Sequence, residues 1–152
     1  MKPTDWASVV YARNPRNEVV LILDPKKPLP HGWKFPGGGK KRFETPEKTA
    51  ARELEEETGL IIDADDLFPV GHVDKRTHTL FLFYVAVPDF GRLKEYGNEG
   101  EWVDTFDAHN LLHMKDFLPD HRPFLHYIKM HETELSQHTP PTKDVSIPLC
   151  PR

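Results

Sequence analysis

The sequence predicts an α/β sandwich built on a mixed β-sheet. Two patterns support this fold class: runs of β-branched and aromatic residues stand on both sides of one well-marked helix, and a second helical segment follows near the C-terminal end. The chain has 152 residues, the length of one ordinary domain, and its 38% apolar and 29% charged residues are typical of a globular protein. We therefore expect a single domain over residues 1–135 and a flexible, Pro-rich tail over residues 136–152.

The N-terminal part is expected to form a β-hairpin followed by a long loop. Trp6 to Arg13 and Glu18 to Asp24 are apolar, β-branched runs, and the Asn- and Pro-containing segment 14–17 between them is typical of a turn. Residues 25–36 include four prolines, which disfavour both a helix and a central strand, so an extended loop is expected. The glycines at 37–39 allow the backbone to approach another group closely.

The clearest helix is expected to begin at Pro46 and to end at Thr58. Thr45 is a favourable N-cap, Pro46 suits the first helical position, and Gly59 stands just past the last helical residue. The sequence signals at the two ends therefore agree on a helix with these bounds.

The C-terminal half is expected to contain three strands and two helices. Leu67 to Val73, Thr77 to Val87 and Glu101 to Phe106 have strand composition, and the second run is apolar enough for a central strand. Asp107 to His113 and Pro119 to about Leu135 are expected to be helical, the latter because its apolar residues recur at roughly helical spacing.

Charge and cysteine content limit the class of protein. The chain has 20 basic and 24 acidic residues, and a net charge of −4 argues against a protein held to nucleic acid by bulk charge. Cys150 is the single cysteine, which favours a reducing compartment. No apolar run is long enough to span a membrane, and the N-terminus has no signal-peptide pattern, so we expect a cytoplasmic protein without a membrane anchor.

Three glutamates of the predicted helix share one narrow face. With 100° per residue, Glu53, Glu56 and Glu57 lie close together, while Ala50 and Leu54 fall on the neighbouring face that would pack on a sheet. Like charges at these spacings destabilise an isolated helix, and clustered carboxylates are typical ligands of Mg²⁺. Taken alone, however, such a run is more often a solvated acidic face.

The residues around these glutamates resemble the Nudix box. That motif reads Gly, five residues, Glu, seven residues, then Arg-Glu-apolar-any-Glu-Glu-any-Gly-apolar, and the stretch preceding it here, Trp33 to Gly38, is also similar to the family's usual approach. All specified positions match without a departure: Gly38, Glu44, Arg52, Glu53, Leu54, Glu56, Glu57, Gly59 and Leu60.

The resemblance implies the family's α/β/α sandwich with a mixed sheet, and hydrolysis of a nucleoside diphosphate linked to another group, with Mg²⁺ or Mn²⁺. It implies that Glu53, Glu56 and Glu57 bind metal and act in catalysis, that Arg52 orients a glutamate by ion pairing, and that the carbonyl of Gly38 is a further metal ligand. An ion pair of Arg52 with Glu56, four residues later, is geometrically reasonable.

A glutamate beyond the box completes the metal site in some members of the family. Glu99 and Glu101 lie in a Gly-containing segment before the last predicted strand, and Glu99 is the preferred ligand, with Glu101 nearly as good. Either residue is equally compatible with a solvated loop charge, and the general base is left open between Glu53 and a loop glutamate.

Residues for substrate binding are suggested by charge and aromatic character. Between residues 25 and 43 there are six basic residues and no acidic one, which suits either a phosphate-binding approach, with Lys40 as one contact, or an ordinary solubilising loop. Trp33, Phe35 and Phe43 could each stack an aromatic ring on a base or ribose, although Phe35 could equally pack in the core. Asp120 is a candidate for recognition of the base.

The range of candidate substrates is narrowed because the sequence lacks the residues that mark other subfamilies of Nudix hydrolases. The chain looks most like compact MutT-like members that convert a (deoxy)nucleoside triphosphate to the monophosphate and pyrophosphate. Pyrophosphohydrolysis at an RNA 5′ end, or hydrolysis of a dinucleoside polyphosphate or nucleotide sugar, is the enzymatic alternative. A non-catalytic nucleotide-binding regulator is the alternative from another class, and the sequence predicts neither a membrane nor a particular protein as partner.

Overall fold

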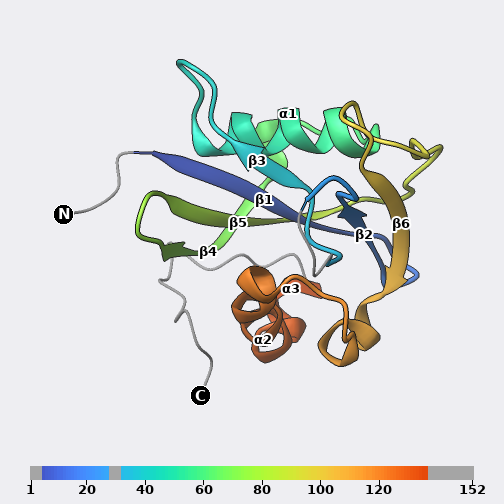
Figure 1. The fold of residues 1–152 in the computed structure, drawn as a ribbon. Helices are drawn as coiled ribbons and strands as arrows, with labels where there is room; N and C mark the ends of the chain where they lie inside the picture. The colour runs from blue at the N-terminus through green and yellow to red at the C-terminus, as the bar shows by residue number, and fades with distance from the viewer. Residues whose placement is uncertain (1–4, 28–31, 137–152) are drawn as a thin grey trace.

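The computed structural model describes residues 5–27 and 32–136 of the chain. A mixed sheet has the strand order β4-β5-β1-β2-β6, and β3 pairs with β1 outside that order. Helix α1 covers one face of the sheet and helices α2 and α3 cover the other (Figure 1), which confirms the predicted sandwich. The helices and strands are β1 (Trp6–Arg13), β2 (Glu18–Leu23), β3 (Gly37–Gly39), α1 (Pro46–Thr58), β4 (Phe68–Asp74), β5 (Thr79–Ala86), β6 (Trp102–Asp107), α2 (Arg122–Met130) and α3 (Glu132–Ser136), with short 3₁₀ helices at Ala64–Asp66, Ala108–His113 and Pro119–His121.

Two apolar clusters hold the layers together, one on each face of the sheet. Leu54 of α1 packs with Val10 and Phe83 on one face. On the other face, Phe124 of α2 packs with Tyr11 and other side chains that point away from α1. Alternate residues of β1 therefore serve opposite layers, as the two-residue period of a strand requires.

The expected hairpin is present, but its strands separate after the turn. β1 and β2 pair at Arg13 and Val19, and β1 then pairs over its whole length with β5 in parallel. The space left between β1 and β2 is filled by the segment around the glycines, since the N–H of Val10 donates to Pro36 O at 2.9 Å. The glycines, expected in a loop, consequently form the short strand β3 against β1. A Cβ on Gly37 would lie 2.0 Å from the carbonyl oxygen of Ser8, so only glycine fits there.

Helix α1 has the predicted ends. The side chain of Thr45 accepts a hydrogen bond from Lys48 N at 3.2 Å, and Gly59 ends the helix with φ of 84°, its N–H donating to Glu55 O at 2.9 Å. Local sequence signals were enough to predict both ends of α1, because the hydrogen bonds of both caps are made to residues of the helix itself.

The segment from Pro119 to Leu135 is helical as expected, except at His131. The chain forms a 3₁₀ turn, then α2, and is interrupted at His131 before α3. The N–H of His131 is shared between the carbonyls of Tyr127 and Ile128, which ends the regular α-helical ladder. The segment Ala108–His113 is helical as expected but is wound as a 3₁₀ helix.

The tail predicted from residue 136 lies outside the described residues beyond Ser136, as does Cys150. In the part of the chain that is described, no helix has both the length and the apolar character needed to cross a membrane.

Candidate active site

A cavity of about 260 Å³ lies beside the acidic face of α1. It is bounded by α1, by strand β3 and by the segment that leads into β6. Its acidic side chains number six against two lysines, so the lining carries a clear excess of negative charge. The lining residues are Asp24, Lys27, Lys34, Gly37, Gly38, Gly39, Glu53, Glu56, Glu57, Asn98, Glu99 and Glu101. The structure thus brings together the three helix glutamates, Gly38 and both candidate loop glutamates.

Arg52 fixes the glutamates around it. Its Nε lies 2.6 Å from Glu44 Oε2, and its Nη1 lies 3.0 Å from Glu53 Oε1 and 3.2 Å from Glu56 Oε2. Its Nη2 donates to the carbonyl of Gly39 at 3.0 Å, which ties strand β3 to the helix. Hydrogen bonds from this guanidinium lower the pKa of Glu44 to about 2. The expected pair with Glu56 is therefore present, within a larger network that also holds Glu44 and Glu53.

Glu57 is a buried carboxyl at the floor of the cavity. Its Oε1 accepts a hydrogen bond from Gly37 N at 2.7 Å. Burial raises the pKa of Glu57, and the neighbouring carboxylate of Glu53 acts in the same direction. An ionised carboxylate at this depth costs free energy unless a cation lies beside it.

Gly38 allows the carboxyl group of Glu53 to lie against the backbone of β3. A Cβ at this position would be 2.7 Å from the carboxyl carbon of Glu53. Burial also raises the pKa of Glu53, while hydrogen bonding from Arg52 lowers it. The glycine of the motif is consequently required by the position of the helix glutamate.

The loop before β6 is anchored so that its glutamates face the helix. Lys94 Nζ donates to Glu56 O at 3.2 Å and to Asn98 Oδ1 at 2.8 Å. Glu101 is buried, and its Oε1 accepts a hydrogen bond from Glu99 N at 3.0 Å, which leaves Glu99 at the exposed rim. The two glutamates thus occupy different depths of the same cavity.

The donor groups fit a hard divalent cation, although they are not yet gathered around one point. Carboxylate oxygens and glycine carbonyls are suitable ligands for Mg²⁺ or Mn²⁺. Within residues 5–27 and 32–136, no three acidic, histidine or cysteine side chains are preassembled as a metal cage. The reason is visible in the contacts: Glu53 and Glu56 turn toward Arg52, and Glu57 toward Gly37. Ligation would require some of these side chains to turn into the cavity.

Lys40 is not the lysine that reaches this cavity. Its Nζ lies over the ring of Trp6, 4.4 Å from the centroid, and 3.8 Å from Asp5 Oδ1. Lys27 and Lys34 line the cavity instead. Both lysines belong to the acid-free stretch that the sequence indicated as a phosphate-binding approach. Composition could not show which basic residues of that stretch reach the cavity.

The three aromatic candidates occupy very different environments. Phe35 is fully buried and packs against Tyr11 and Phe117, so a stacking contact with substrate is incompatible with its position. Trp33 packs against Phe106 with ring centroids 4.8 Å apart. Phe43 is 90% exposed and has a φ of 66°, an unusual conformation for a residue other than glycine.

Asp120 lies away from the cavity lining. Its Oδ2 is 3.0 Å from Lys75 Nζ, and this hydrogen bond lowers the pKa of Asp120. Asp24 and Asn98, by contrast, line the cavity and were not singled out by the sequence. Asp24 directly follows β2, and the end of a strand was the signal that could have indicated it.

Comparison with known proteins gives a family match over most of the chain. The model of the NUDIX domain matches residues 3–128. An ADP-ribose pyrophosphatase of Methanocaldococcus jannaschii is 32% identical over 98 residues, covering 62% of this chain and 57% of that protein. Diphosphoinositol polyphosphate phosphohydrolase 2 of Rattus norvegicus is 27% identical over 128 residues, covering 82% and 70%. The chain thus spans little more than half of the archaeal relative. Both names support a hydrolase that acts on anhydrides in phosphorus-containing substrates.

Solved structures agree on the fold. A MutT structure from a study of Aliivibrio salmonicida and Vibrio cholerae superposes with a TM-score of 0.70 at 23% identity, covering 83% of this chain and 98% of that one. A MutT protein of Methanosarcina mazei gives a TM-score of 0.68 at 19% identity, covering 86% and 96%. At these identities the likeness concerns the architecture.

Proposed function

The chain belongs to the Nudix hydrolase family, and from this premise we propose that it hydrolyses a phosphoric anhydride in a nucleoside diphosphate-linked substrate with the help of Mg²⁺ or Mn²⁺. The observation that carries the proposal is the cavity in which six carboxylates, the glycine backbone of β3 and two lysines meet. Such a site can hold divalent cations on its acidic side and phosphate oxygens on its basic side.

Binding of the substrate is assigned to the basic part of the lining. Lys27 and Lys34 are positioned to contact phosphate oxygens, and Lys41 Nζ, 3.9 Å from Glu56 Oε1, can exchange that contact for one with substrate. Glu53, Glu56 and Glu57, the carbonyl of Gly38 and the rim residue Glu99 are the proposed metal ligands. Arg52 keeps Glu53 and Glu56 in place through its rigid planar guanidinium.

The reaction is attack of water on one phosphorus of the anhydride, with cleavage of its P–O–P bond; the fragment on the other side of the bridging oxygen departs, which for a triphosphate is pyrophosphate or the nucleoside monophosphate. The chemistry supplied by a bound divalent cation is neutralisation of phosphate oxygens and a lower pKa for the attacking water. A carboxylate of this cavity takes the proton of that water. Glu53 and the loop glutamates Glu99 and Glu101 are the candidates, and comparing the pH profiles of E53Q, E99Q and E101Q separates the base from the ligands.

A nucleoside triphosphate is the proposed substrate, giving the monophosphate and pyrophosphate. Support comes from the similarity in architecture to MutT proteins. An ADP-ribose-like nucleotide sugar is the second candidate, because the archaeal relative is named for that activity.

A substrate panel tests the proposal. Purified protein with Mg²⁺ or Mn²⁺ is incubated with nucleoside triphosphates, nucleotide sugars, dinucleoside polyphosphates and triphosphorylated RNA, and the products are separated by ion-exchange chromatography. Release of nucleoside monophosphate and pyrophosphate from a triphosphate is expected. Turnover of a nucleotide sugar alone would move the assignment to the second candidate, and no turnover of any compound would favour a non-catalytic nucleotide-binding protein.

A further inference from the structure

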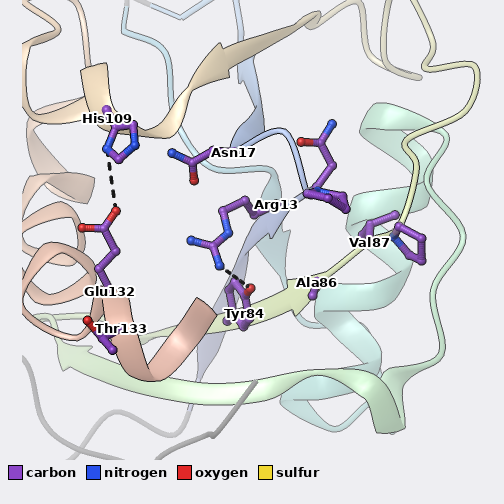
Figure 2. Close-up of a pocket in the computed structure, with 11 residues that line it drawn as sticks. Arg13, Asn17, Tyr84, Ala86, Val87, His109, Glu132 and Thr133 are labelled. Atoms are coloured by element: carbon purple, nitrogen blue, oxygen red, sulfur yellow. Dashed lines mark hydrogen bonds and ion pairs between the residues drawn. The ribbon is translucent and has the colours of Figure 1, made fainter. Parts of the chain in front are cut away.

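A larger cavity, of about 720 Å³, lies on the face of the sheet opposite to α1 (Figure 2). Its walls come from the β1–β2 turn, the end of β5, the 3₁₀ helix after β6 and the start of α3. Tyr84 and Ala86, which line it, belong to the α2 side of the sheet, whereas the carboxylate cavity lies beside α1. Nothing in the proposed hydrolysis uses this second cavity.

Arg13 is held rigidly at the edge of this cavity. Its Nη2 donates to the hydroxyl of Tyr84 at 3.1 Å, and its guanidinium carbon lies 5.5 Å from the Tyr84 ring centroid. No carboxylate among the described residues forms an ion pair with Arg13. A guanidinium has five N–H donors, so the hydrogen bond to Tyr84 leaves donors for a ligand.

Further hydrogen-bonding groups face the same space. Figure 2 shows the guanidinium of Arg13 and the amide of Asn17 directed toward the gap that separates them from His109 and Glu132. The side chain of Asn17 makes no hydrogen bond to another described residue. Glu132 is paired with Lys129, whose Nζ lies 3.1 Å from its Oε2, and its Oε1 lies 3.8 Å from His109 Nδ1.

The charge and size of the cavity restrict its ligand. An immobilised, unpaired arginine favours an oxyanion, and the separate N–H donors of Arg13, Asn17 and His109 suit the three oxygens of a phosphate group better than the two of a carboxylate. Ala86, Val87 and Pro88 supply an apolar wall for an organic body. The volume lies in the range of small-molecule sites.

We propose that this cavity is a second ligand site, which binds the phosphate monoester of a small organic molecule through Arg13 and Asn17. The inference does not depend on the proposed hydrolysis. The site would bind its ligand without metal, because its positive charge comes from the chain itself.

The test is a titration with adenosine 5′-monophosphate in EDTA, followed by amide chemical shifts of isotope-labelled protein. In the absence of metal, the excess negative charge of the carboxylate cavity repels the nucleotide, so binding there is disfavoured. Shifts are expected in residues 13–17 and 84–88. Inorganic phosphate is expected to bind the same residues more weakly, and adenosine not at all.

Arg13→Gln is expected to weaken binding by roughly tenfold or more, since a charge-assisted hydrogen bond is lost. Arg16→Gln is the matched control: Arg16 lies in the same turn, its side chain is 81% exposed, and it does not line the cavity. Asn17→Gly removes the amide while suiting the φ of 61° at this position, so it keeps the test valid if Arg13→Gln does not fold. Equal losses in both arginine variants, shifts confined to residues 37–39 and 98–101, or no binding at millimolar concentration would each overturn the proposal.

Discussion

The two cavities of this protein, on opposite faces of one sheet, differ in how their charges are balanced. The cavity beside α1 gathers carboxylates whose repulsion is relieved only in part, by Arg52, and two of them, Glu57 and Glu101, are buried. The cavity beside α3 presents one arginine, which Tyr84 holds without neutralising its charge. An incomplete charge balance favours a ligand of opposite sign, so the first site suits cations and the second suits anions.

The largest effect is expected from Glu57→Gln. This change removes a carboxylate from the floor of the cation cavity, and turnover should fall by at least 100-fold, in the range found for lost catalytic groups. Glu55→Gln is the control, because Glu55 is an exposed residue of the same helix that does not line the cavity. Steady-state kinetics and circular dichroism measure the two variants. Retained turnover in the folded Glu57→Gln protein would remove the helix glutamates from the mechanism.

Arg52→Lys is expected to reduce activity by roughly 10- to 100-fold, as is usual when a group that orients metal ligands is lost. Lysine keeps the charge but cannot reach Glu44, Glu53 and Gly39 together, as the planar guanidinium does. The Mg²⁺ concentration at half-maximal rate should rise, and this is measured by metal titration. Arg42→Lys, a change outside the cavity lining, should leave that midpoint where it is; an equal rise in both variants would contradict a specific role for Arg52.

A pH effect on stability is expected from His121, a buried residue on the α2 side. Burial lowers the pKa of His121 to about 3, and the nearby Lys34 and Lys75 act in the same direction against Asp120. Since the unfolded chain binds the proton with an ordinary pKa near 6.5, the contribution of neutral His121 is fully present above that pH. It is lost as the pH falls from about 6.5 toward 3.

Urea unfolding at pH 7 and pH 5 measures this loss. In His121→Gln the difference in the free energy of unfolding between the two pH values should be smaller than in the wild type. His126→Gln, at an exposed position of α2, should retain the wild-type difference. An unchanged difference in His121→Gln would mean that other groups cause the acid sensitivity.

The smallest effect is expected at Phe43. Its φ of 66° is unfavourable for a residue with a Cβ, and its ring makes little contact with the rest of the chain. The free energy of unfolding of Phe43→Gly should therefore be about 1 kcal/mol higher than that of Phe43→Ala, which removes the same ring but keeps the backbone strain. Denaturant unfolding compares the pair, and equal stability would show that the turn relaxes without glycine.

Prediction from the sequence succeeded where a structure is specified locally. Helix α1 has its N-cap, first-turn proline and terminal glycine within a few residues of one another, so both ends were found. Strand β3 was missed because its pairing depends on the separation of β1 and β2, which no local pattern records.

In the candidate site, too, features specified by local sequence were predicted, and features that depend on the folded chain were not. The spacing of Glu53, Glu56 and Glu57 placed them on one face, and all three line one cavity. The lysine that reaches the cavity was harder to predict, because Lys40 and Lys34 belong to one basic stretch. They differ only in the direction that the folded backbone gives their side chains. Phe35 and Phe43 were indistinguishable as aromatic residues, although one is fully buried and the other 90% exposed.

The parallel pairing of β1 with β5 has a consequence for synthesis of the protein. Trp6 pairs with Thr79 and Arg13 with Ala86, so one edge of β1 has to await a partner more than 70 residues later, although its other edge can pair with β2 and β3. Until then β1, whose apolar run includes Val9 and Val10, has one open strand edge. The nascent chain should accordingly be most prone to aggregate before residue 86 emerges, and most sensitive to chaperones in that interval.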